Sequence, residues 1–167
     1  MCMVVYVASD YALPTSAWDQ ARPQFYVEEV SDRDAPVRRH FSQPCVYYAG
    51  SHEGCGCGFQ YGEYEFDYDD DDPSANEESR RRLVANQDSR RRLAEFLAVA
   101  LQHQPAVEVF ACWRGDEAVQ VEHRGRVRPA DLLRDRTFFR ERELLVISEQ
   151  DAGPLSWPTD LTENENP

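Results

Sequence analysis

Lysine is absent from this sequence of 167 residues, so all 18 basic side chains belong to arginine. The 31 acidic residues outnumber them and give a formal net charge of −13 at pH 7. Proteins that bind the phosphate backbone of nucleic acids normally present an excess of basic side chains. The overall charge therefore argues against a nucleic-acid partner, although residues 79–148 are locally basic, with 14 arginines against 10 acids.

Long hydrophobic runs are also missing, since every apolar stretch is far shorter than the roughly 18 residues of a membrane-spanning helix. The sequence has no Asn-x-Ser/Thr acceptor, no charged leader before its first apolar stretch, and an odd number of cysteines, five. These features are not typical of a secreted, disulfide-bonded protein. We expect a cytoplasmic protein in a reducing compartment, with no membrane partner.

The sequence motifs of several common enzyme classes are absent as well. It contains no phosphate-binding P-loop, no GxSxG nucleophile motif and no HExxH zinc motif. No complete set of nucleophile, base and orienting residue can be assembled from the remaining candidates. The sequence therefore leaves an enzymatic role open and favours a binding protein.

The hydrophobic pattern predicts pairs of strands separated by helices, rather than a regular alternation of the two. Strands are predicted at residues 3–8, 25–30, 45–48, 59–68, 107–113, 118–124 and 144–147, a short helix at 34–41 and a long helix at 74–104. The strands 107–113 and 118–124 are predicted to form a hairpin. This order favours an α+β fold, with a mixed or mostly antiparallel sheet covered on one face by the long helix. Residues 1–150 should form the single domain, and 151–167 a polar, flexible tail.

A near-repeat lies within the predicted long helix, where ESRRRLVANQ is followed directly by DSRRRLAEFL. The two copies are offset by ten residues, which is about 280° beyond two full turns of an α-helix. Leu83 and Leu93 would therefore lie on different faces of one straight helix. Either the first copy is a solvated part of the helix, or Asp88 and Ser89 begin a second one.

Cysteine and glycine are concentrated in one segment, residues 45–68, which holds three cysteines and five glycines. Glycine at this density indicates tight turns or the close approach of something to the backbone. Gly54, Gly56 and Gly58 are therefore candidate ligand-binding residues. A purely structural loop is the alternative.

The same segment contains the residue types that bind transition metals. His52, Cys55 and Cys57 form an H-x2-C-x-C set, and Cys45 could supply a fourth ligand. Zinc prefers four nitrogen or sulfur ligands, and iron is also held by thiolates. Zinc or iron is therefore the candidate cofactor, and whether the protein holds any cofactor stays open. Two other interpretations stay open: the cysteines could simply pack in the core, or a thiol could be catalytic, with Cys2 as an N-terminal nucleophile.

A run of acidic residues follows the same segment and ends in Asp69, Asp70, Asp71 and Asp72. So many carboxylates cannot be buried together, and their exposed field would attract a basic protein. These aspartates are the candidate partner-binding residues of an alternative function, an acidic interaction module of the inhibitor or immunity type.

Three motifs resemble those of a group of small bacterial proteins that have no assigned activity. They are ASDY at residues 8–11, SHEGCGCGFQYG at 51–62 and CWRGDE at 112–117, and the resemblance extends to about Ile147. CGCG is also similar to the C-terminal motif of A-type iron–sulfur carriers, two of whose cluster ligands would fall on Cys55 and Cys57. The third ligand of those carriers has no matching position upstream.

Overall fold

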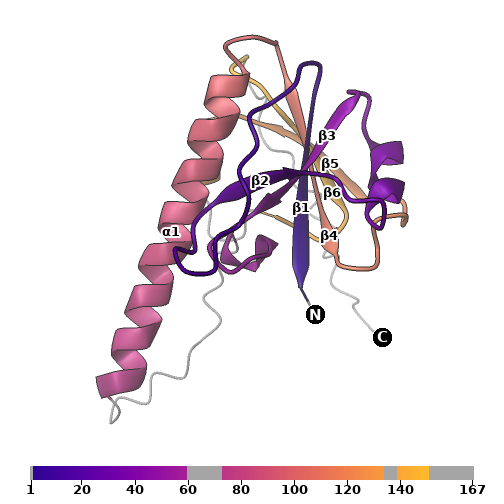
Figure 1. The fold of residues 1–167 in the computed structure, drawn as a ribbon. Helices are drawn as coiled ribbons and strands as arrows, with labels where there is room; N and C mark the ends of the chain where they lie inside the picture. The colour runs from indigo at the N-terminus through magenta and orange to yellow at the C-terminus, as the bar shows by residue number, and fades with distance from the viewer. Residues whose placement is uncertain (1, 60–72, 134–138, 151–167) are drawn as a thin grey trace, which may run out of the picture.

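One six-stranded sheet organises the computed structural model, which describes residues 2–59, 73–133 and 139–150 (Figure 1). Its strands are β1 (Met3–Ser9), β2 (Tyr26–Glu29), β3 (Cys45–Gly50), β4 (Val107–Trp113), β5 (His123–Val127) and β6 (Glu143–Ile147). They lie in the order β2–β3–β1–β4–β6–β5, and every neighbouring pair is antiparallel except β5 and β6. The predicted α+β fold with a mostly antiparallel sheet is confirmed.

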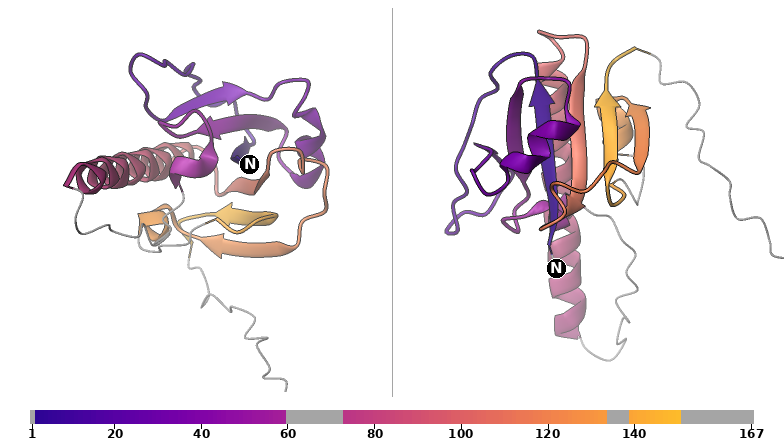
Figure 2. Two further views of the ribbon diagram at one scale, coloured as in Figure 1. Left: turned by 90° about the horizontal axis from the view of Figure 1, so that it is seen from below. Right: turned by 90° about the vertical axis from the view of Figure 1, so that its right-hand side faces the viewer.

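Strand β1 is buried along its whole length because both faces of the sheet are covered. Its unbroken apolar sequence is typical of such a strand. Val5 and Val7 face α1 (Pro73–Ala100), whose Leu93 and Leu97 complete the larger apolar core. Figure 2 shows α1 on one side of the sheet and the short helix η1 (Ala35–His40) on the other.

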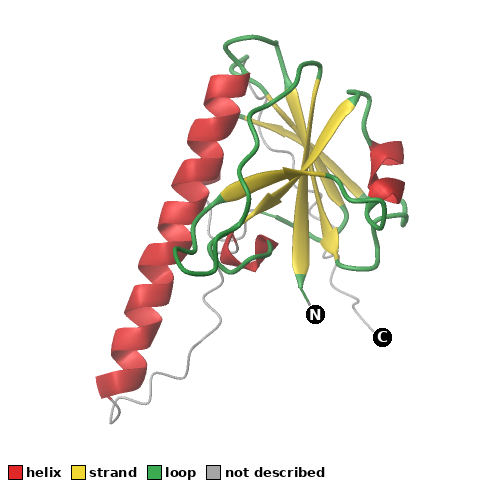
Figure 3. Cartoon of the chain, in the orientation of Figure 1, coloured by secondary structure: helices red, strands yellow, loops and turns green. Residues whose placement is uncertain are grey.

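Helix α1 is continuous through both copies of the near-repeat, so the first of the two alternatives holds. Its 28 residues correspond to about 42 Å, roughly twice the length of the longest strands. Its N-terminal end consequently extends past the end of the sheet (Figure 3). The other helices among the described residues, η1, η2 (Gly56–Phe59) and η3 (Pro129–Leu133), are short 3-10 segments. No helix within the described ranges has the length and hydropathy required to span a membrane.

The second face of the sheet carries a smaller core that includes polar groups. Tyr6 and Tyr48 lie there beside Phe110 and Val37. Helix η1, with a proline in its first turn, agrees with the helix predicted in this region. The Asp34 side chain does not cap it, and instead accepts a hydrogen bond from the Ser31 hydroxyl at 3.0 Å.

The predicted hairpin of residues 107–113 and 118–124 is wrong. Strand β4 lies between β1 and β6, and β5 pairs in parallel with β6 at the edge of the sheet. Glu117 provides the physical reason, because its buried carboxylate accepts hydrogen bonds from the Gly115 N–H at 2.9 Å and the Tyr6 hydroxyl at 3.4 Å. These bonds hold the chain over the second face rather than beside β4.

Phe59 was predicted to begin a strand and lies instead in the 3-10 turn η2 (Gly56–Phe59). Its ring is fully buried, with edge contacts to Phe25 and Phe139, so it fills the space between sheet and helix. The rest of that predicted strand, the aspartates 69–72 and the predicted tail 151–167 lie outside the described residues.

Candidate metal centre

A tight turn after β3 brings residues 51–58, which we call the Gly/Cys loop, back to the end of the sheet. The buried Ser51 closes it, because its N–H and its hydroxyl both donate to the Cys55 carbonyl, at 2.8 and 2.6 Å. The Gly58 N–H then donates to the Ser51 hydroxyl oxygen at 3.2 Å. One side chain therefore fixes the path of the loop on both sides of Cys55.

The glycines of this loop allow it to pack closely on the protein itself. Gly54 has a φ of 73°, a conformation that favours glycine. A Cβ atom at Gly56 would lie 3.0 Å from the Met3 carbonyl oxygen, and one at Gly58 would lie 2.5 Å from the Ser51 hydroxyl. The chain's own packing thus accounts for all three glycines, and their role in binding a small ligand stays a prediction.

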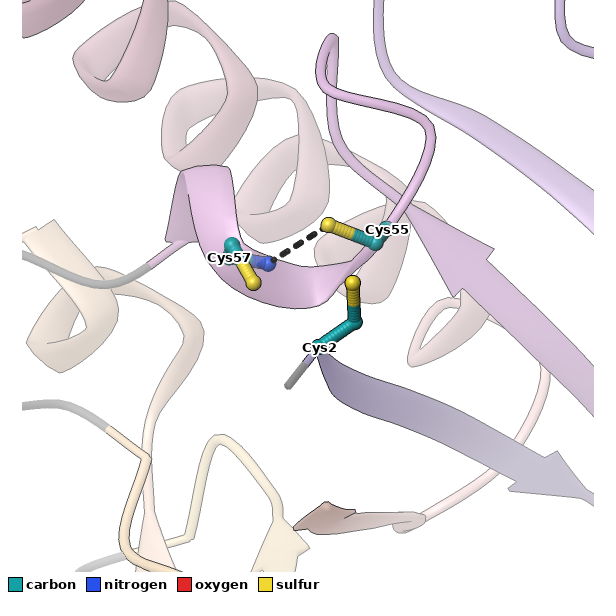
Figure 4. Close-up of side chains that lie close together, drawn as sticks. All are labelled: Cys2, Cys55 and Cys57. Carbon is teal, nitrogen blue, oxygen red and sulfur yellow. Dashed lines mark hydrogen bonds between the residues drawn. The ribbon is translucent and has the colours of Figure 1, made fainter. Parts of the chain in front are cut away.

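Three thiols converge where this loop meets the start of β1 (Figure 4). The Sγ atoms of Cys2, Cys55 and Cys57 all lie within 4.8 Å of one another. Cys2 immediately precedes β1, and its carbonyl accepts a hydrogen bond from the Arg114 N–H at 2.9 Å. We call these three residues the thiol cluster. It joins two segments that are distant in the sequence.

Backbone amides point at two of the sulfur atoms. The Met3 N–H donates to the Cys57 Sγ at 3.4 Å, and the Cys57 N–H donates to the Cys55 Sγ at 3.5 Å. Hydrogen bonds of this kind stabilise negative charge on sulfur. Cys2 is exposed and Cys57 is partly exposed, so an ion can reach the cluster from solvent on their side.

Burial raises the pKa of the Cys55 thiol to about 12, the Cys57 N–H opposes that rise, and the neighbouring thiols of Cys57 and Cys2 add to it. A raised pKa is the opposite of what a nucleophilic cysteine needs at neutral pH. A bound cation would remove the repulsion between the sulfurs and displace their protons. The raised pKa of Cys55 therefore argues against this thiol as a nucleophile, and a metal ion bound there would have to displace its proton.

The spacing of the sulfurs fits one metal ion. With Zn–S bonds of about 2.3 Å, the sulfurs of a tetrahedral site are about 3.8 Å apart. The observed limit of 4.8 Å therefore requires only small side-chain rotations. Within the ranges that the structure describes, no other His, Cys, Asp or Glu joins this group.

His52 and Cys45, the other two predicted metal ligands, lie elsewhere. The His52 Nδ1 lies 2.9 Å from the Ser89 hydroxyl of α1, and burial lowers the pKa of its ring. Cys45 pairs with Ser9, at the end of β1 that is remote from Met3. The structure thus brings Cys55 and Cys57 together with Cys2, and not with His52 or Cys45.

Cys2 was not among the ligands expected from the sequence, which suggested for it only the role of a nucleophile. A signal was present nevertheless. Antiparallel pairing of β1 with β3 places the residue before β1 beside the loop after β3. Both strands are predicted from the sequence, with Cys2 just before the first and Cys55 shortly after the second. Their antiparallel pairing would have indicated that these two cysteines meet.

Comparisons with protein-family models, with curated proteins and with solved structures gave no match to this chain.

Proposed function

We propose that this protein binds a single thiophilic metal ion, with zinc as the first candidate, through Cys2, Cys55 and Cys57. The observation that supports the proposal is the convergence of three Sγ atoms within 4.8 Å. Thiolates select zinc, copper(I) and iron among the biological metals. An iron–sulfur cluster occupies the space between its ligands and would need them farther apart, so a mononuclear site is the better fit.

The proposed site has three protein ligands from the described residues and one accessible side at Cys2. A tetrahedral ion with three protein ligands can complete its coordination with water or with a small external ligand. The ion would also tie the start of β1 to the loop after β3. We therefore expect metal binding to stabilise the fold as well as to present a reachable metal.

Metal titration of the reduced, metal-free protein tests the proposal. We expect one zinc ion per chain, with the release of protons from the thiols. Cobalt(II) in place of zinc should give the intense absorption of sulfur-to-metal charge transfer. Serine variants at each of the three cysteines should weaken zinc binding at least about 10-fold, measured by competition with a coloured chelator.

Cys45→Ser is the matched control, because Cys45 is also a partly exposed cysteine but lies at the other end of the sheet. It should bind zinc with unchanged affinity. Circular dichroism establishes that each variant is folded. Zinc affinity that is unaffected by all three cluster substitutions, or a wild-type protein that binds no metal, would overturn the proposal.

A further inference from the structure

Two tyrosine hydroxyls converge on one backbone carbonyl beside the thiol cluster. Tyr26 Oη donates to the Gly54 carbonyl at 3.0 Å, and Tyr48 Oη donates to the same oxygen at 3.4 Å. Their rings, from β2 and β3, are in contact at 5.9 Å between centroids. A carbonyl oxygen has two lone pairs, so both are used. These bonds fix the peptide plane that leads directly into Cys55.

Arg114 connects this arrangement to the other half of the thiol cluster. Its backbone N–H holds the Cys2 carbonyl at 2.9 Å, and its Nη2 donates to the Tyr48 hydroxyl at 3.5 Å. The guanidinium also lies 5.7 Å from the centre of the Tyr48 ring. Its Nη1 is 3.8 Å from Oδ1 of Asp34, whose side chain is only 10% exposed. One residue at the end of β4 therefore contacts the supports of both cysteine-bearing segments.

We propose that Tyr26, Tyr48 and Arg114 are positioning residues that set the metal affinity of the thiol cluster. This inference rests on the proposed function. The sulfurs come from two segments, so their relative positions depend on the main chain at Cys2 and at Cys55. A network that holds both backbones before the ion arrives lowers the cost of bringing the ligands together. A hydrogen bond from Arg114 also polarises the Tyr48 hydroxyl as a donor to Gly54.

Removal of single hydroxyl groups tests the inference, with an internal control on the same strand. Tyr48→Phe and Tyr26→Phe each delete one donor to Gly54 and leave every cysteine in place. Tyr47→Phe is the control. Tyr47 is as buried as Tyr48, at 7% exposed, but its hydroxyl accepts from the Leu13 N–H at 3.0 Å, away from the thiol cluster.

We expect Tyr48→Phe and Tyr26→Phe each to weaken zinc binding by about 10-fold and the double variant to weaken it further, as the loss of a hydrogen bond that supports a metal ligand does. The cobalt(II) charge-transfer band should shift in these variants. In the metal-free protein, all three Tyr→Phe variants should lower the urea midpoint by similar amounts. Tyr47→Phe alone should leave zinc affinity and the cobalt spectrum unchanged.

Two outcomes would overturn the inference. In the first, Tyr26→Phe and Tyr48→Phe lower stability as Tyr47→Phe does but leave zinc affinity and the cobalt spectrum of the wild type. The hydroxyls would then serve the fold alone, and the proposed metal function would stand. In the second, wild-type protein binds no zinc, and both proposals fail together.

Discussion

The two copies of the sequence SRRRL in α1 have the same residues and very different surroundings. Leu83 in the first copy is 42% exposed, whereas Leu93 in the second is 1% exposed. Arg80 is exposed, whereas Arg90 is only 5% exposed. The local helical propensity of the two copies is the same. Burial here is therefore decided by where each copy lies against the sheet and not by its own sequence.

Helix geometry explains the difference. Ten residues advance a helix by about 15 Å and leave the second copy about 80° from the direction of the first. The second copy packs against the sheet, and the first lies nearer the N-terminal end of α1, which extends past the sheet (Figure 1). Matched substitutions in the two copies separate the contribution of packing from that of helix propensity.

The largest difference is expected for the leucines. Leu93→Ala should destabilise the protein by about 3 kcal/mol, because it removes a fully buried side chain and leaves a cavity. Leu83→Ala should change stability by less than about 0.5 kcal/mol, since its side chain is solvated and alanine is a good helix former. Urea unfolding of both variants measures the contrast. Equal losses would show that the first copy also has a packing partner.

The serines should give an intermediate effect. Ser89 Oγ accepts a hydrogen bond from the His52 N–H at 3.2 Å and also bonds to His52 Nδ1, so it ties α1 to the Gly/Cys loop. Ser89→Ala leaves a partly buried N–H without this acceptor and should cost about 1–2 kcal/mol. Ser79→Ala, the same change ten residues earlier, should be neutral or slightly stabilising.

Hydrogen exchange provides the site-specific check on Ser89. The His52 amide should exchange faster in Ser89→Ala and at the wild-type rate in Ser79→Ala. An unchanged His52 amide in both variants would mean that Ser89 does not hold the loop.

The smallest effect concerns the acidic residues that begin the copies. Hydrogen bonds from Arg92, and then from Arg91, hold the pKa of Asp88 below its usual range. Its contribution to stability is therefore present above the unfolded value of about 3.9 and is lost as the pH falls toward the folded pKa. Asp88→Asn should remove this part of the pH dependence. The effect should be small because the pair is exposed to solvent and screened by salt.

Urea unfolding between about pH 5 and pH 2 tests this last prediction, because the linkage appears as a slope of stability against pH. Glu78→Gln, at the matching position of the first copy, is the control. A slope in Asp88→Asn that equals that of the wild type would assign the pH dependence to other carboxylates.

Much of the fold could be predicted because it depends on local pattern. The apolar run of β1, the buried strand β6 and the stripe of Leu93 and Leu97 each indicate their element directly. The pairing of β4 could not be predicted in this way. A local hairpin is the simplest partner for a strand, and only the tertiary contact of Glu117 with Tyr6 shows why the chain leaves β4.

The candidate site could likewise be predicted only where it depends on local sequence. Cys55 and Cys57 could be selected from their spacing and from the surrounding glycines. Cys2 could not be selected from spacing, because its contact with them depends on the pairing of β1 with β3. Histidine is a common metal ligand, but the Nδ1 of His52 is hydrogen-bonded to Ser89 of α1. Chemistry identifies candidate ligands, and topology decides which of them meet.

The central position of β1 has a consequence for synthesis of the chain. Strand β1 is synthesised before β4, with which it pairs. About 100 residues must be added after β1 before Met3 can pair with Trp113 and Ala8 with Glu108. At about 5–20 residues per second, this interval is on the order of 5–20 s. Strand β3 can pair with one edge of β1 as soon as residues 45–50 emerge, but the other edge of this apolar, β-branched strand has no partner during the interval, and such edges are prone to aggregate. Yield in cells should therefore depend on chaperones that shield β1 until β4 emerges.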